Sequence, residues 1–100
     1  MTSALLAPTA TVVHLRGVID IFSSNALRQR LLRLLPTSEG TLICDLSCAS
    51  FDDVSGLGVL VGARRRARSM GILLALAAPN PYTAELLRTT GLGPGFLIYE

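Results

Sequence analysis

Several residue types that characterise common protein classes are scarce in this sequence. It has no tryptophan, no lysine, one histidine and two cysteines among 100 residues. Two cysteines cannot build the disulfide framework of a small secreted domain, and they suit a reducing cytoplasm. The single histidine, His14, has no cysteine at metal-ligand spacing, so no metal site can be read from the sequence. We therefore expect a cytoplasmic protein without a metal centre.

Long apolar runs and concentrated charge are absent as well. The longest apolar run, residues 72–78, has the length of a strand and is much shorter than a membrane-spanning helix. The first ten residues are apolar but lack the basic start of a signal peptide. Nine arginines against seven acidic residues give a net charge of +2, which is too small for a nucleic-acid-binding face. Neither membrane insertion nor nucleic-acid binding is expected.

The composition that remains is that of a compact globular protein. Half of the residues are hydrophobic and 16% are charged, which is typical of a packed core and not of a disordered chain. One hundred residues suffice for one small domain, so we expect a single domain over residues 1–100. We expect Cys44 to be buried and Cys48 to be accessible. An extended segment between them would hold their sulfurs too far apart for a disulfide.

The stretch that carries the functional signal runs from residue 41 to residue 68. Residues 41–47 are short, largely apolar and bounded by turn formers, which predicts a buried strand. Ser55 then stands where a helix N-cap is expected, directly before apolar residues at helical spacing. A hydroxyl would thus lie at the positive end of a helix, beyond the carboxyl end of a strand. Open α/β sheets commonly place function at that edge.

The rest of the chain alternates between strand-like and helix-like segments, which predicts an α/β fold. A strand, a helix and a strand in succession should make the strands at 41–47 and 72–78 parallel. The helix after Ser55 should close at Gly71. We expect further strands over residues 4–7, 11–16 and 96–99, with a hairpin between the first two. Helices should begin at Ser23–Asn25 and at Pro81, the latter with Ala84, Leu86 and Leu87 inward.

The helix after Ser55 carries two glycines on its outward side. At about 100° per residue, the residues that fall opposite the apolar core face are Ser55, Gly58, Gly62, Arg65 and Arg66. Each glycine costs a helix roughly 1 kcal/mol relative to alanine, so two of them one turn apart suggest that another backbone comes close. That backbone belongs either to a partner protein or to a neighbouring loop of the same domain. The run Arg64–Arg68 is typical of a solvated helix face, from which Arg65 and Arg66 would steer an acidic partner.

Motifs for catalysis are missing. Ser55 is flanked by Asp53 and Leu57 at the positions where a nucleophile elbow has glycines. There is no Walker loop, and residues 56–58 alone are too weak a signal for a dinucleotide fingerprint. The sequence therefore indicates a substrate of an enzyme and not an enzyme.

Three segments resemble one known family. Residues 51–60, Phe-Asp-Asp-Val-Ser-Gly-Leu-Gly-Val-Leu, resemble the signature loop and helix of STAS domains, in particular of bacterial anti-sigma factor antagonists. Residues 17–20 are similar to the Gly-Glu-Leu-Asp turn of that family, and residues 87–92 to its Leu-x-x-x-Gly-Leu turn. The resemblance covers most of the chain. It implies the STAS fold, a small mixed β-sheet with helices packed mainly on one face.

The resemblance also implies which residues form the site. Ser55 matches the serine that is phosphorylated, in that family, by a partner kinase that is also the anti-sigma factor. Asp20 matches an aspartate close to the phosphoacceptor loop, although a turn residue that bonds nearby backbone amides would explain it equally. The residues assigned to the phosphorylation loop and the partner-binding surface are Asp20, Asp53, Val54, Gly56, Gly58, Gly62, Arg65 and Arg66.

The function implied by the resemblance is that of a bacterial transcription regulator that works by partner switching. Unphosphorylated, the protein would bind a Ser/Thr kinase-type anti-sigma factor and free the sigma factor; phosphorylation on Ser55 would release it. The kinase would supply ATP and Mg²⁺, so the chain itself needs no cofactor. Two other functions remain open: a STAS subunit of an ABC-type lipid transporter, and a STAS module that senses a nucleotide or a small apolar ligand.

The sequence departs from the family pattern at three places. Val54 replaces the first serine of the usual pair, which leaves Ser55 as the only hydroxyl at the helix start. Asp52 stands where an apolar residue is usual and adds negative charge beside the phosphoacceptor. The sequence ends at Glu100, directly after the last predicted strand, without the family's usual C-terminal helix. We expect the apolar strip that this leaves exposed to favour a homodimer.

Overall fold

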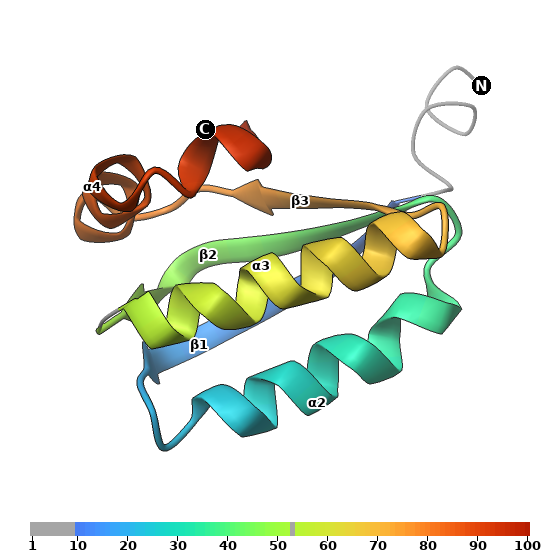
Figure 1. The fold of residues 1–100 in the computed structure, drawn as a ribbon, viewed down its shortest axis with the longest axis horizontal. Coiled ribbons are helices and arrows are strands. Elements are labelled where there is room, and N and C mark those ends of the chain that lie inside the picture. Colours follow the sequence, from blue (N-terminus) through green and yellow to red (C-terminus); the bar gives the residue numbers. More distant parts are fainter. Residues whose placement is uncertain (1–9, 53) are drawn as a thin grey trace.

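The structure, a computed structural model, describes residues 10–52 and 54–100 as a four-stranded sheet with three α-helices (Figure 1). The strands lie in the order β1-β2-β3-β4, and each neighbouring pair is parallel. This confirms the predicted α/β class and the parallel pairing of the two central strands. The strand expected over residues 4–7 lies outside the described residues. The elements are β1 (Ala10–Ile19), α2 (Ser24–Leu34), the 3-10 turn η1 (Leu35–Thr37), β2 (Thr41–Phe51), α3 (Val54–Ser69), β3 (Leu73–Ala77), α4 (Pro81–Thr90), the 3-10 turn η2 (Gly93–Gly95) and β4 (Leu97–Tyr99).

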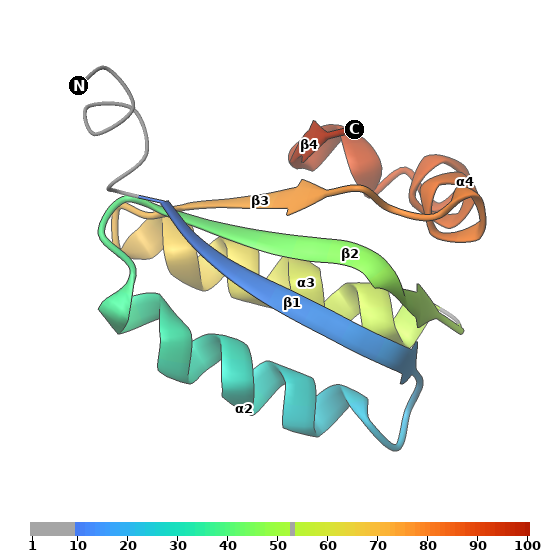
Figure 2. The same ribbon diagram turned by 180° about the vertical axis from the view of Figure 1, so that it is seen from behind.

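Helices α2 and α3 cover one face of the sheet, as Figures 1 and 2 show from its two sides. Their apolar stripes bury a core of large side chains against that face, as amphipathic helices on a sheet must. The opposite face carries no helix in the described part of the chain, and it leaves Val12, Leu73, Leu97 and Tyr99 about half exposed. Helices packed mainly on one face are therefore confirmed. The core residues include Leu15, Leu31, Leu35, Leu42, Leu46, Phe51, Leu57, Leu60, Leu74 and Leu76.

Strand β2 contains a bulge that its sequence does not reveal. His14 of β1 pairs with Asp45, but Arg16 pairs with Cys48, so β2 has one more residue than β1 in this interval. The inward-facing residues of β2 have even numbers up to residue 46 and odd numbers from residue 49. The bulge therefore turns Phe51 into the core. The strand predicted to end at residue 47 continues to residue 51, because the bulge reverses the alternation without ending the pairing.

Strand β1 is also longer than predicted. Residues 17–19, expected as a turn, belong to the strand and pair with residues 49–51 of β2. Gly17 has a φ of 81°, a backbone conformation that residues with a Cβ rarely adopt. The turn begins only at Asp20, so β1 and β2 end together at the edge where α3 begins (Figure 1).

Helix α3 ends at the glycine that was predicted to close it. The N–H of Gly71 donates to the carbonyl of Arg68 at 3.1 Å, and the N–H of Ile72 donates to the carbonyl of Ala67 at 2.8 Å. With Gly71 at a φ of 73°, these bonds make a Schellman motif. The motif turns the chain directly into β3.

Helix α4 begins at Pro81, as predicted, but faces the core with a different stripe. Asn80 caps it, since the side-chain oxygen of Asn80 accepts from the N–H of Thr83 at 2.7 Å. Thr83 and Leu87, four residues apart, are the buried pair. Ala84, expected to point inward, is exposed, because this short helix meets the core along a single row.

The bulge gives the two cysteines different environments, and this difference can be tested. Both thiols are free; burial raises the pKa of Cys44 to about 12, whereas Cys48 is exposed. Because the thiolate is the reactive form, iodoacetamide at mildly alkaline pH should modify Cys48 in the folded protein and spare Cys44. Peptide mass mapping reads the result, with a urea-unfolded sample as the control in which both react. Equal labelling of both cysteines in the folded protein would contradict this placement.

Candidate functional site

Ser55 lies at the start of α3, at the edge of the sheet where β1 and β2 end (Figure 1). It is exposed. Because α3 begins at Val54, Ser55 is the second residue of the helix. The prediction that Ser55 is the N-cap is therefore wrong. The first four N–H groups of a helix have no intrahelical acceptor. The hydroxyl therefore still lies at the positive end of the helix dipole.

Gly56, assigned from the sequence to the partner-binding loop, is buried and faces inward. A Cβ at this position would lie 2.9 Å from Cδ2 of Phe51 and 3.1 Å from the carbonyl oxygen of Ile19. The first turn of α3 thus packs directly on the ends of β1 and β2. The N–H of Asp52 donates to the same Ile19 carbonyl at 3.0 Å and closes the gap between the strands. Gly56 therefore packs the helix start against the strand ends, and it contributes no exposed surface to a partner-binding site.

Asp20 lies at this same edge, next to Ile19, but its carboxylate is engaged in its own turn. Oδ1 of Asp20 accepts from the N–H of Phe22 at 2.9 Å and from the N–H of Ser23 at 3.0 Å. The hydroxyl of Ser23 also donates to Oδ1, at 3.2 Å, and accepts from the N–H of Asp20 at 3.0 Å. Of the two sequence-based interpretations of Asp20, these bonds match the turn residue.

The loop before Ser55 is tied to helix α4. The hydroxyl of Tyr82 donates to the carbonyl of Asp52 at 3.3 Å, and Asn80 donates to the hydroxyl of Ser50 at 2.9 Å. Asp52 itself is exposed, whereas Asp53, another predicted loop residue, lies outside the described residues. Sequence reasoning missed Tyr82, because only the fold brings residue 82 to residue 52.

The outward side of α3 carries the two glycines and two arginines that helical spacing predicts there. Gly58, Gly62, Arg65 and Arg66 are all exposed. A Cβ built at Gly58 or Gly62 would meet no other atom of the described chain within 4 Å. A neighbouring loop from the described residues therefore does not explain these two glycines.

Several apolar side chains lie exposed at this end of the sheet, and of these only Val54 was assigned to the site from the sequence. Val54 directly precedes Ser55, Ile21 and Phe22 form the tip of the turn after β1, and Tyr82 begins α4. We call these four residues the apolar rim. These residues belong to three separate segments: the turn after β1, α3 and α4. In the sequence, the signal for each is that it interrupts a polar or turn-forming segment.

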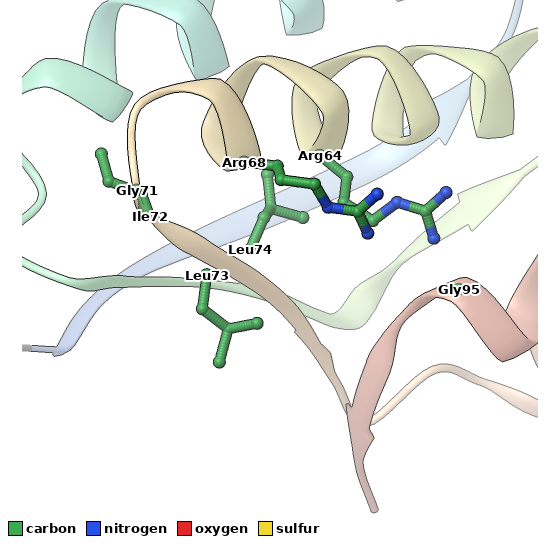
Figure 3. A pocket seen from close by; sticks show the side chains of 7 residues that line it. All are labelled: Arg64, Arg68, Gly71, Ile72, Leu73, Leu74 and Gly95. Carbon is green, nitrogen blue, oxygen red and sulfur yellow. The ribbon is translucent and has the colours of Figure 1, made fainter.

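Arg64 departs from its predicted place on a solvated helix face. Its guanidinium lies 4.5 Å from the ring centroid of Phe96 and packs directly against Gly95, where a Cβ would have no room. Arg64 and Arg68 point toward η2 across a cleft of about 310 Å³ (Figure 3). This cation–π contact fastens the segment before β4 to α3. The cleft lies along the C-terminal half of α3, whereas Ser55 lies at the N-terminus.

Two further properties of the described residues bear on the class of protein. No helix among them has the length and apolar character that crossing a bilayer demands. No three histidine, cysteine, aspartate or glutamate side chains of residues 10–52 and 54–100 gather in a metal-binding arrangement.

Comparison with known proteins identifies the family. The sequence matches the model of the STAS domain over residues 3–100. The chain belongs to the STAS domain family. It is 34% identical, over 80 residues, to the anti-sigma-B factor antagonist of Bacillus subtilis (strain 168), a match that covers 80% of this chain and 72% of that protein.

Solved structures share the fold. An anti-sigma factor antagonist from Mycobacterium paratuberculosis matches with a TM-score of 0.79 at 27% identity, over 92% of this chain and 78% of that chain. The anti-sigma factor antagonist SpoIIAA of Bacillus matches at 23% identity over 95% of this chain. Its unphosphorylated form has a TM-score of 0.74 over 84% of that chain, and its phosphorylated form 0.67 over 86%. These relatives are regulators and not enzymes, in agreement with the lack of catalytic motifs.

One buried glycine of α3, Gly56, and one exposed glycine, Gly62, provide a matched test of this geometry. Gly56→Ala should destabilise the protein by about 1–3 kcal/mol, because overpacking against Phe51 and Ile19 outweighs the better helix propensity of alanine. Gly62→Ala adds a Cβ in open space and should stabilise by roughly 0.5–1 kcal/mol. Urea unfolding of both variants gives the two signs. A stabilising Gly56→Ala would show that α3 does not rest on the strand ends as described.

Proposed function

We propose that this protein is an anti-sigma factor antagonist whose Ser55 is phosphorylated by a kinase-type anti-sigma factor, and that phosphorylation switches binding off. The observation that carries the proposal is an exposed serine at the N-terminus of α3, in a chain that is 34% identical to an anti-sigma-B factor antagonist. SpoIIAA, which shares the fold, occurs in unphosphorylated and phosphorylated forms. The same chemistry is available here.

The position of Ser55 suits both states of such a switch. As a hydroxyl it is small and exposed at the edge of the sheet, where an active site can reach it. As a phosphate it would lie at the positive dipole end of α3, so the phosphorylated protein needs no unfolding of the helix. Ser55 directly precedes Gly56, and the close packing of Gly56 on Phe51 and Ile19 holds the start of α3 against the strand ends.

Phosphorylation would oppose binding through charge. A phosphate adds about −1.5 to −2 charges beside Asp52, which is exposed on the same loop. An interface fitted to a neutral hydroxyl supplies neither water nor cations to this charge, and desolvating it without a partner is costly. The exposed glycines of α3 would let a partner backbone approach closely along the same face.

Phosphorylation should be confined to Ser55. Incubation with ATP, Mg²⁺ and the kinase-type anti-sigma factors purified from the source organism should add one phosphate, and Ser55→Ala should abolish the addition. Ser50→Ala is the matched control, because the Ser50 hydroxyl is already bonded to Asn80 at the same edge. Tandem mass spectrometry locates the phosphate. Tight binding to the anti-sigma factor without any phosphate transfer would contradict the phosphorylation switch.

Mimicking the phosphate should weaken binding without unfolding the protein. Ser55→Asp should bind the anti-sigma factor at least tenfold more weakly, a loss of about 1.4 kcal/mol or more, with a melting temperature near that of the wild type. Gly62→Leu should weaken binding by steric bulk on the same face. Thr37→Asp places the same charge on an exposed residue of η1 and should bind normally. Isothermal titration calorimetry measures all three; wild-type affinity for both site variants would place the docking face elsewhere.

A further inference from the structure

The turn after β1, which follows the Ile19 contact with the first turn of α3, holds two large apolar side chains in solvent. Phe22 is 88% exposed and Ile21 is 61% exposed. Val54 and Tyr82 of the same apolar rim are 51% and 57% exposed. A single exposed apolar residue needs no explanation, but four of them on segments that meet at one end of the sheet indicate an interaction surface.

The backbone of this turn is held by hydrogen bonds within the turn itself. Oδ1 of Asp20 accepts from two consecutive backbone N–H groups, those of Phe22 and Ser23. The Ser23 hydroxyl bonds Asp20 and also donates to the carbonyl of Val18 at 3.2 Å. The backbone N–H groups of Ser23 and Ser24 both donate to the carbonyl of Asp20, at 3.2 and 2.9 Å, which leads into α2. The side chain of Phe22 is therefore presented outward on a fixed backbone, which lowers the entropy lost when it is buried by a partner.

The position of the turn indicates which partner would cover Ile21 and Phe22. Ile19, which lies one residue before the turn begins at Asp20, contacts the first turn of α3 at Gly56, next to Ser55, so a partner that covers Ser55 also comes close to the turn. A second copy of this chain bound here would shield Ser55 from a kinase. A phosphoryl-transfer site is itself polar and adds little apolar contact, so the affinity for such a partner must come from neighbouring side chains.

We propose that Ile21 and Phe22 form the main apolar anchor of this protein, which inserts into an apolar pocket on the same kinase-type anti-sigma factor that modifies Ser55. In this role Asp20 is a positioning residue: its carboxylate holds the tip and does not contact the partner. The inference rests on the proposed function and adds to it the residues that supply affinity independently of phosphorylation.

Truncating the anchor should cost much of the affinity. Phe22→Ala should weaken binding to the purified anti-sigma factor, loaded with ADP, by roughly thirtyfold, as expected of a buried aromatic anchor. Tyr99→Ala is the matched control: Tyr99 is 48% exposed on β4, away from Ser55, and its loss should change affinity less than twofold. Both variants should melt near the wild-type temperature. Calorimetric titration measures the affinities, and wild-type affinity for Phe22→Ala would overturn the inference.

Two variants of Asp20 separate positioning from direct contact. Asp20→Asn keeps an Oδ1 acceptor for the N–H groups of Phe22 and Ser23, so it should bind within about threefold of the wild type. Asp20→Ala removes the acceptor, frees the tip and should weaken binding roughly tenfold. Equal losses for both variants would mean that the carboxylate charge contacts the partner, which overturns the positioning role.

The remaining outcomes distinguish the inference from the proposed function. If the wild type is phosphorylated on Ser55 and binds, but Phe22→Ala does so equally well, the proposed function stands and the anchor is wrong. If no purified kinase-type anti-sigma factor binds or modifies the wild type, the proposed function fails and the anchor fails with it. If sedimentation shows a wild-type dimer that Phe22→Ala makes monomeric, a second copy occupies the tip and the inference is overturned.

Discussion

The close packing of the first turn of α3 on the ends of β1 and β2 is the constraint on which this site depends. Gly56 permits it, because any side chain at that position would overlap Phe51 or the Ile19 carbonyl. The same Ile19 carbonyl accepts from Asp52 and so joins the two strand ends. The bulge in β2 is what brings Phe51 to this position. Through these contacts the hydroxyl of Ser55, the turn at Asp20 and the start of α4 become neighbours, although they are far apart in the sequence.

Much of the fold could be predicted because periodicity reports local burial. The alternation of residues 11–16, the apolar run before residue 78 and the leucine stripe of α2 each indicated the correct element. The errors fall where pairing between distant residues decides the outcome. No local pattern shows that β2 gains a residue against β1 after Asp45, so the strand was ended at the point where its alternation reversed. The resemblance of residues 17–20 to a family turn predicts a turn from Gly17, whereas pairing with β2 keeps Gly17 in the strand.

The site divides along the same line. Helical geometry alone places Gly58, Gly62, Arg65 and Arg66 on one exposed face, and the structure puts them there. Residues whose surroundings come from other elements were misjudged. Gly56 directly follows Ser55 in the sequence yet faces the interior. Arg64, although part of the arginine run, packs on Phe96. Ile21, Phe22 and Tyr82 of the apolar rim could not be found from the sequence, because exposure of an apolar side chain is a property of the fold and not of its sequence neighbours.

A switch of this kind must let one edge of the protein serve two purposes with opposite physical requirements. Affinity calls for apolar contact that is fully desolvated, whereas the phosphorylated state calls for hydration or cations around added charge. The structure separates these tasks in space without separating them in function. In the proposed switch, the apolar tip is the turn held by Asp20, and the phosphoacceptor is Ser55 on the first turn of α3, which Ile19 contacts at Gly56. Charge added at Ser55 would weaken the interface and leave the apolar anchor unchanged. Removal of the phosphate would restore binding, because a phosphate at a helix N-terminus requires no refolding.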